Sequence, residues 1–148
     1  MRHETNWFWT CINGYLPDGH HFLLNLSMGV NETGMSENAC WLDGQIFYLT
    51  PVLFSRNEIN SQDKINQNTS TKNLQPWHIY HQNLGWSKVD IDLTFMPITV
   101  YQKTDNFGMI ASIFEQWLGE YSGEIRIGDQ VVKIDKVIGL AEDHFAKW

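Results

Sequence analysis

The 148-residue sequence has few of the residues that define several large protein classes. Its two cysteines, Cys11 and Cys40, are too few for a disulfide framework and have no C-x-x-C spacing, so we interpret both as small buried side chains. Lys and Arg total 10 against 17 Asp and Glu, which gives a net charge of −7. Without a basic stripe to neutralise phosphates, the chain is not expected to bind nucleic acid.

Long apolar segments and cofactor motifs are also missing. No apolar run approaches the about 18 residues of a membrane-spanning helix, and no secretory leader opens the sequence, so we expect no membrane span and a cytoplasmic location. The sequence contains no G-x-S-x-G, no H-E-x-x-H, no phosphate-binding glycine loop and no His or Cys spacing typical of zinc sites. We therefore expect no metal and no cofactor.

Aromatic residues, by contrast, are abundant. They make up 14% of a sequence that is 43% hydrophobic, and they include 7 Trp. A chain of this size and composition can bury a real core, so we predict a single domain over residues 1–148. The stretch 55–76 is polar and rich in Asn, Gln, Ser and Thr, and we interpret it as a loop inserted between strands.

The dominant hydrophobic period is two, which indicates strands. Val89, Ile91, Leu93 and Phe95 alternate with polar residues, as in a strand with one wet face. Asp43-Gly44 is a dipeptide suited to a type I′ hairpin turn, with both residues at positive φ. Strands are predicted over Trp7–Leu16, His20–Val30, Ala39–Leu42, Gln45–Phe54, Trp77–His81, Ser87–Phe95, Ile98–Lys103, Ile110–Tyr121, Glu124–Ile127 and Val131–Ile138. This pattern favours an all-β antiparallel barrel or sandwich with hairpin connections.

Tryptophan is more frequent than a core of this size needs, because a buried indole N–H requires a partner. Trp7 and Trp9 share one face of a predicted strand. One interpretation is an aromatic-walled cavity for an apolar or cationic ligand; the other is ordinary core packing.

Near the end of the chain, Glu142 and His144 would share one face of a strand and Asp143 the other. A carboxylate beside an imidazole can create a proton donor, although a solvated strand end would give the same pattern. Other carboxylates, such as Glu37 and Glu115, could pair in three dimensions without leaving a sequence signal.

A series of short segments, taken together and in order, resembles the C-terminal half of the domain-of-unknown-function 2804 family. The segments are Asn6-Trp7-Phe8-Trp9, Leu23-Leu24-Asn25-Leu26, Ser36-Glu37-Asn38, Asp43-Gly44, Leu49-Thr50-Pro51-Val52, Pro76-Trp77-His78-Ile79, Leu93-Thr94-Phe95-Met96-Pro97, Phe114-Glu115-Gln116-Trp117-Leu118-Gly119 and 139–148. The sequence departs from the family in two ways. Glu115 stands where Gly is common, and members usually have a further stretch of comparable length before the Trp-x-Trp segment.

The resemblance implies a lipocalin-like barrel or half-open barrel of about 8–10 strands. It also implies a distant similarity to two-domain lipocalin-like proteins that include carotenoid hydratases, which hold long apolar substrates near acidic and aromatic residues. With the N-terminal half of the family absent, a site shared between halves would need a second copy of this chain or another chain.

Two hypotheses follow. In the first, a barrel cavity lined by Trp7, Trp9, Trp41 and Trp117 binds an apolar, isoprenoid- or lipid-like molecule. If this site is catalytic, Glu142 or His144 is the acid for hydratase- or cyclase-like chemistry and Glu37 is a second carboxylate. In the second, a non-enzymatic β-sandwich binds glycans or a protein partner through exposed aromatics. A closed interior cluster of aromatics favours the first, and a flat exposed row favours the second.

Overall fold

The computed structural model describes residues 4–29, 37–56, 74–81 and 89–148. These residues form strands and no helix, so none of them belongs to a helix that could cross a membrane. The strands are β1 (Glu4–Tyr15), β2 (His21–Met28), β3 (Ala39–Leu42), β4 (Gln45–Tyr48), β5 (Val52–Arg56), β6 (Trp77–His81), β7 (Val89–Asn106), β8 (Ala111–Ile127) and β9 (Gln130–Lys147). The predicted all-β class is confirmed.

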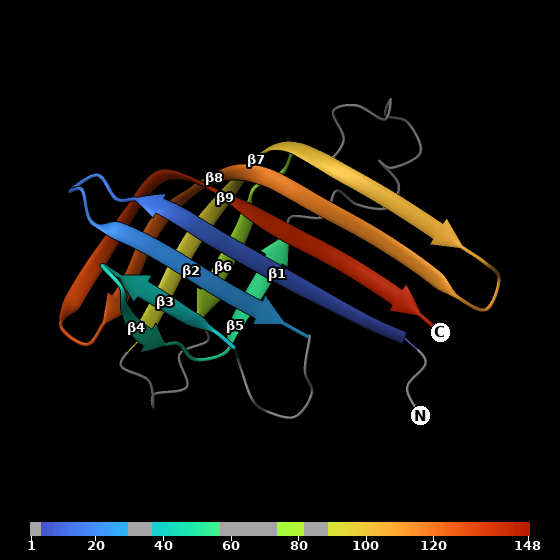
Figure 1. The fold of residues 1–148 in the computed structure, drawn as a ribbon, viewed down its shortest axis with the longest axis horizontal. Coiled ribbons are helices and arrows are strands. Elements are labelled where there is room, and N and C mark those ends of the chain that lie inside the picture. The colour runs from blue at the N-terminus through green and yellow to red at the C-terminus, as the bar shows by residue number, and fades with distance from the viewer. Residues whose placement is uncertain (1–3, 30–36, 57–73, 82–88) are drawn as a thin grey trace.

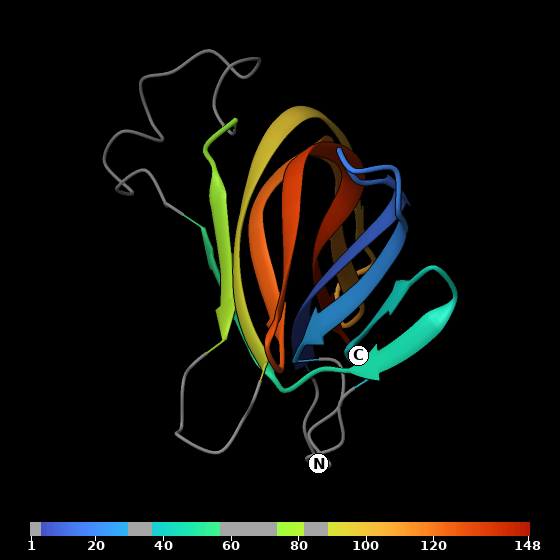
Figure 2. The same cartoon turned by 90° about the vertical axis from the view of Figure 1, so that its left-hand side faces the viewer.

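All nine strands belong to one antiparallel sheet, in the order β4-β3-β2-β1-β9-β8-β7-β6-β5. The sheet curls strongly, as Figure 2 shows, so that β5 and β6 cross behind β1 and β9 in Figure 1. Strands β2 and β5 come into contact across the interior without hydrogen-bonding as neighbours. The result is a half-barrel, which confirms the half-open form of the predicted fold.

Backbone irregularities bend the three long strands. The pairing of β7 with β8 shifts register between Pro97 and Thr99, and that of β8 with β9 shifts between Tyr121 and Gly123. Opposite the second shift, Lys136 adopts a φ of 51°. Bulges of this kind increase local twist and bend a strand, so they bring the far ends of the sheet round to face each other.

A single hydrophobic core fills the concave face. Its largest fully buried side chains are Trp77, Trp117, Tyr121, Phe22 and Phe95. The buried hydroxyls of Thr10 and Tyr121 are paired, because they contact each other and both lie within hydrogen-bond distance of the carbonyl of Leu140, so that one donates to the other and the second donates to the carbonyl. The curled sheet therefore buries indole rings and the Tyr121 phenol, and the phenol hydroxyl keeps its hydrogen-bond partners.

Several predicted strand bounds were wrong. The predicted strand Gln45–Phe54 is two strands, β4 and β5, on opposite edges of the sheet. The predicted pairs Ser87–Phe95 with Ile98–Lys103, and Ile110–Tyr121 with Glu124–Ile127, are continuous as β7 and β8 because bulges absorb the interruptions. Strand β9 also runs on beyond the predicted Val131–Ile138. Of the predicted insert 55–76, residues 57–73 lie outside the described residues, as do Ser87 and Lys88.

The hairpin turn at Asp43-Gly44 has the predicted conformation. Asp43 and Gly44 have φ values of 50° and 85°, as a type I′ turn requires. The Asp43 carboxylate accepts a hydrogen bond from the His21 backbone N–H at 2.9 Å and contacts the His20 ring at 2.5 Å. This contact raises the pKa of His20 and lowers that of Asp43.

Candidate functional site

Alternation along the strands divides the polar and aromatic side chains between two faces of the sheet. On the concave face, Arg56 at the end of β5 donates from one guanidinium nitrogen to Glu115 and to Asp143, each at 2.9 Å. Gln102 donates to the other oxygen of Glu115 at 2.7 Å. We call these four residues, which come from β5, β7, β8 and β9, the concave charge cluster. One guanidinium between two carboxylates leaves it with a net charge of −1.

Two indoles lie directly against the guanidinium. The Cζ of Arg56 is 4.8 Å from the ring centroid of Trp117 and 5.1 Å from that of Trp77. Phe8 packs edge-on to Trp77 and stacks on Phe54, with centroids 5.9 and 5.7 Å apart. The indole N–H groups of Trp77 and Trp117 are buried and have no hydrogen-bond partner among the described residues. The charge cluster is therefore set in an aromatic wall rather than on a solvated surface.

The concave face continues past the end of the core. In Figure 1, β7, β8, β9 and β1 run beyond the region that β5 and β6 cover. Ile113, two residues before Glu115 and thus on the same face, is 46% exposed. The side chains of Arg56, Glu115 and Asp143 are 17–25% exposed. The concave charge cluster thus lies where the packed core gives way to partly solvent-exposed side chains.

On the outer face, four of the residues singled out from the sequence come together. Trp7, Trp9, Glu37 and Glu142, with Ser27, line a hollow of about 380 Å³, which we call the outer hollow. The cross-strand pairing of Trp7 with His144 and of Trp9 with Glu142 brings the start of the chain to its end. Their proximity is consistent with a shared site, and their individual roles stay predictions.

Hydrogen bonds hold the walls of the outer hollow. The Trp9 indole donates to Asn25 Oδ1 at 2.8 Å, and Asn25 Nδ2 donates to the Glu37 backbone carbonyl at 3.1 Å. Gln116 donates to Glu142 Oε1 at 2.7 Å. These contacts fix one indole and one carboxylate before any ligand arrives.

His144 lies behind Trp7, with ring centroids 4.1 Å apart, and its Nε2 is 2.9 Å from the Ser112 hydroxyl. Burial lowers the pKa of His144, although the nearby carboxylates of Glu142 and Asp143 oppose the shift. Beyond it, Phe114 and Tyr101 continue a row of aromatic rings along the outer face. The rings are tilted by 51–76° from one to the next, so they do not form the coplanar platform that favours glycan stacking.

The other predicted site residues lie apart. Trp41, which pairs with Leu23, is on the outer face but does not line the hollow. Trp117 is fully buried on the concave face. The seven predicted residues therefore do not form one cavity, because Trp7, Trp9, Glu37, Glu142 and His144 face away from the interior that Trp117 lines.

Sequence reasoning missed Arg56, Gln102 and Asp143 as members of a site. The sequence did contain a signal for Arg56, because it lies two residues after Phe54 and four after Val52, so all three point to the same, inward face of the strand. A charged residue in an apolar register implies a buried partner. The partners could not be identified, because Glu115 and Asp143 are 59 and 87 residues away.

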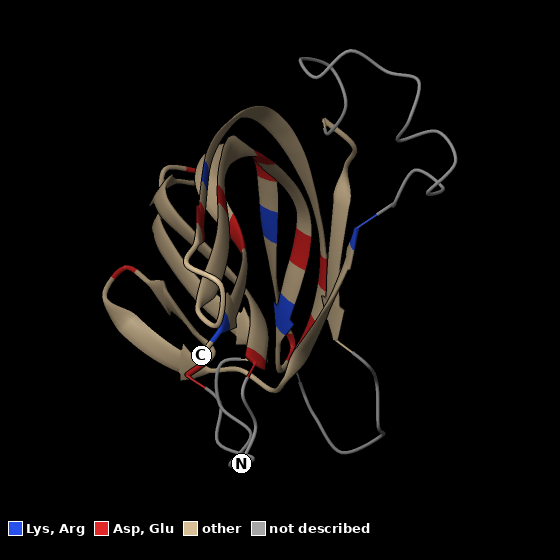
Figure 3. Ribbon diagram, turned by 90° about the vertical axis from the view of Figure 1, so that its right-hand side faces the viewer, with Lys and Arg blue, Asp and Glu red and all other residues tan. Residues whose placement is uncertain are grey.

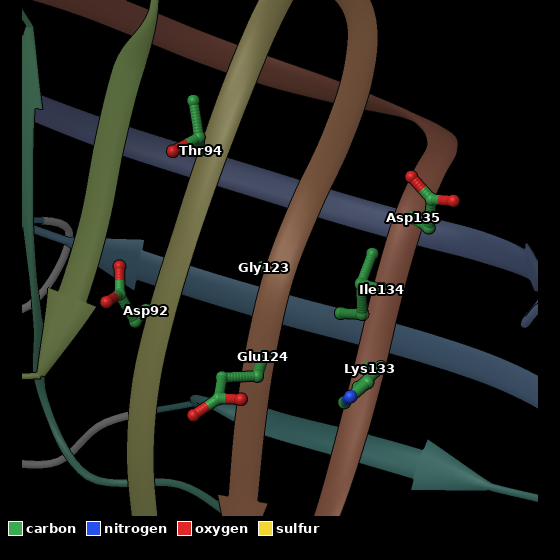
Figure 4. A pocket seen from close by; sticks show the side chains of 7 residues that line it. All are labelled: Asp92, Thr94, Gly123, Glu124, Lys133, Ile134 and Asp135. Carbon is green, nitrogen blue, oxygen red and sulfur yellow. The ribbon is translucent and has the colours of Figure 1, made fainter.

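A second hollow, of about 500 Å³, lies at the bulge between β7, β8 and β9. Figure 4 shows its side chains spread along three strands, with Glu124 and Lys133 opposite each other in register. Its lining residues in the described part of the chain include no aromatic side chain. Figure 3 shows acidic and basic residues interspersed on the strands. This surface resembles a solvated sheet face more than a binding site.

Comparisons with known proteins place the chain in a family without assigning an activity. The model of a domain of unknown function, DUF2804, matches residues 1–148. No curated protein matches the sequence. Among solved structures, the chain is similar to a protein from Nitrosomonas europaea provisionally identified as AttH, with 11% sequence identity and a TM-score of 0.48. The similarity covers 97% of this chain and 51% of that one, so this chain spans about half the length of its structural neighbour.

Proposed function

The chain belongs to the DUF2804 family, whose function is unknown, and from this premise we propose that it binds an apolar, isoprenoid- or lipid-like small molecule on the concave face of the half-barrel. The observation that carries the proposal is the concave charge cluster, with Arg56 held between Glu115 and Asp143 and against two indoles where the face becomes accessible. In this account Phe8, Phe54 and Ile113 contact the apolar body of the ligand.

The charge cluster suits a particular polar group. Both carboxylates already bind Arg56, and the two carboxylates with the one guanidinium carry a net charge of −1. A ligand that ends in a hydroxyl could donate to Glu115 or Asp143 without opposing the net negative charge. A fatty-acid carboxylate would be repelled by the carboxylates of Glu115 and Asp143, so an alcohol or an unfunctionalised polyene fits better.

The same arrangement would suit acid-catalysed hydration of an alkene. In such a reaction a carboxyl group gives its proton to one alkene carbon, and water adds to the resulting carbocation and returns a proton to the carboxylate; Glu115 and Asp143 are the carboxyl groups of the concave charge cluster. On the concave face these two carboxyl groups replace Glu142, His144 and Glu37 as the candidate acids, since the latter three face outward.

A matched pair of surface variants tests the binding site. Ile113, at 46% exposure, faces the concave side, whereas Ile138, at 49%, faces outward on the neighbouring strand. Ile113→Glu places a charge where the apolar ligand would lie and should weaken binding about tenfold or more, since burying one large aliphatic side chain contributes about 1.5–3 kcal/mol. Ile138→Glu should leave binding unchanged.

The measurement is a fluorescence titration with retinol, a polyene alcohol, on the whole chain. Circular dichroism on each variant establishes that the fold is retained. Equal retinol affinity in the two variants, or none in the unmodified protein, would contradict a concave-face site.

A further inference from the structure

We infer that the outer hollow is a second binding site, for an organic cation that has a quaternary or tertiary ammonium group. The hollow is separate from the concave face, because Trp7 and Trp9 alternate with Phe8, whose ring packs into the interior. The inference therefore stands independently of the function proposed above.

Charge decides the class of ligand. Glu37 and Glu142 line the outer hollow, and among the described residues neither Lys nor Arg lines it. An anion would be repelled by the two carboxylates. A neutral apolar molecule would displace water from them without replacing the hydrogen bonds that the water makes. A cation would gain from both carboxylates, and the net charge of −7 on the whole chain favours its approach.

The aromatic walls distinguish an organic cation from a metal ion. The indoles of Trp7 and Trp9 offer π-faces, which attract ammonium groups that keep little bound water. Among the described residues, no group of three or more His, Cys, Asp or Glu side chains is arranged to hold a metal ion. Two indoles with two carboxylates match the composition of aromatic cages that bind methylated ammonium groups.

The cage is largely preformed, and no Lys or Arg of the described part of the chain lines it. Asn25 fixes the Trp9 indole, the His144 ring packs against Trp7, and Gln116 fixes Glu142. Burial lowers the pKa of His144, which disfavours a positive charge on the imidazole beside Trp7. A preformed site loses less conformational entropy when it binds.

The volume of the outer hollow limits the size of the ligand that it can bind. A volume of about 380 Å³ falls within the range of small-molecule sites and exceeds that of a trimethylammonium group alone. The best ligand should therefore have an apolar extension beyond the charged head.

Choline and neohexanol, its neutral isostere with carbon in place of the quaternary nitrogen, separate charge from shape. Nitrogen–proton correlation spectra of the whole chain resolve each indole N–H and locate the binding. Choline should shift the Trp7 and Trp9 signals, leave the buried Trp77 and Trp117 signals in place, and bind at least about tenfold more tightly than neohexanol. Equal shifts with the two compounds, or none with choline at millimolar concentrations, would overturn the inference.

Substitutions give a second test. Glu142→Gln and Glu37→Gln should each weaken choline binding several-fold, whereas Glu120→Gln, on the same outer face but outside the hollow, should not. Trp9→Leu should abolish the binding and Trp41→Leu should preserve it. Thermal melts distinguish lost binding from lost folding; a folded Glu142→Gln variant with unchanged choline affinity would contradict the site.

Discussion

The alternation of side chains along each strand decides on which face of the sheet a residue lies. Arg56, Glu115 and Asp143 meet because each occupies a position of its strand that points to the concave face. Glu142 and His144 occupy the alternate positions of β9 and point outward. The sequence already predicted that Glu142 and His144 share one face and Asp143 the other. It could not predict which of the two faces is concave, because this depends on the direction in which the whole sheet curls.

The pKa values of two histidines, His144 and His20, should be shifted in opposite directions from that of an ordinary histidine. Burial lowers the pKa of His144, so its contribution to stability is present above the unfolded value, about 6.5, and is lost as pH falls through the folded value. The Asp43 contact raises the pKa of His20, so its contribution is present below about 6.5 and is lost as pH rises through the folded value.

A proton NMR titration of the imidazole signals measures both pKa values, with Asp43→Asn as the control that should return His20 alone to its ordinary range. A pKa of His144 above that of His20 would contradict the burial and the contact described here.

At the scale of strands, local signals gave some elements their true bounds. Ala39–Leu42 and Trp77–His81 were predicted with the bounds that β3 and β6 have, because turn residues or polar segments flank both. The predicted strands leave gaps that contain Pro97 and Gly123, but a bulge lets a long strand continue past either residue. Long-strand continuity depends on pairing with neighbours, which the local sequence does not contain.

Gly119 and Gly139 pair directly across β8 and β9, and both lie under aromatic rings of the core. A Cβ at Gly119 would lie 2.4 Å from the Met96 carbonyl and 2.5 Å from the Phe95 ring, and one at Gly139 would lie 2.5 Å from the Cys11 carbonyl. Since backbone oxygens cannot move aside cheaply, Gly119→Ala and Gly139→Ala should each destabilise the fold by about 2–3 kcal/mol or more.

Urea denaturation measures these losses. Gly19→Ala is the control, because Gly19 has a φ of 89° and open space around it, so only backbone strain of about 1–2 kcal/mol is expected there. Equal or smaller losses at Gly119 and Gly139 would show that the sheet relaxes around the added carbon.

For the whole molecule, composition and hairpin patterning predicted an all-β antiparallel barrel or sandwich, and the family resemblance implied the half-open barrel, whereas the concave charge cluster was not predictable. The cluster joins residues from four strands, two of which, β5 and β9, lie at distant places in the sheet order. Their approach depends on curl rather than on hydrogen-bonded pairing. The outer hollow was partly predictable, because its residues belong to β1 and β9, which are direct neighbours, and to segments beside them.

The described sheet ends in two edges, β4 and β5. Whether the concave site functions in one copy, in a homodimer or with a further chain stays a prediction of the sequence. Each of these arrangements keeps the concave charge cluster on the same face.

Native mass spectrometry of the gently purified protein tests the concave-face site most directly. The account predicts extra mass from an apolar molecule on the unmodified chain, whether it is a monomer or a dimer. That mass should be retained by Ile138→Glu and lost from Ile113→Glu. A bare unmodified chain, or extra mass that survives Ile113→Glu, would contradict the account.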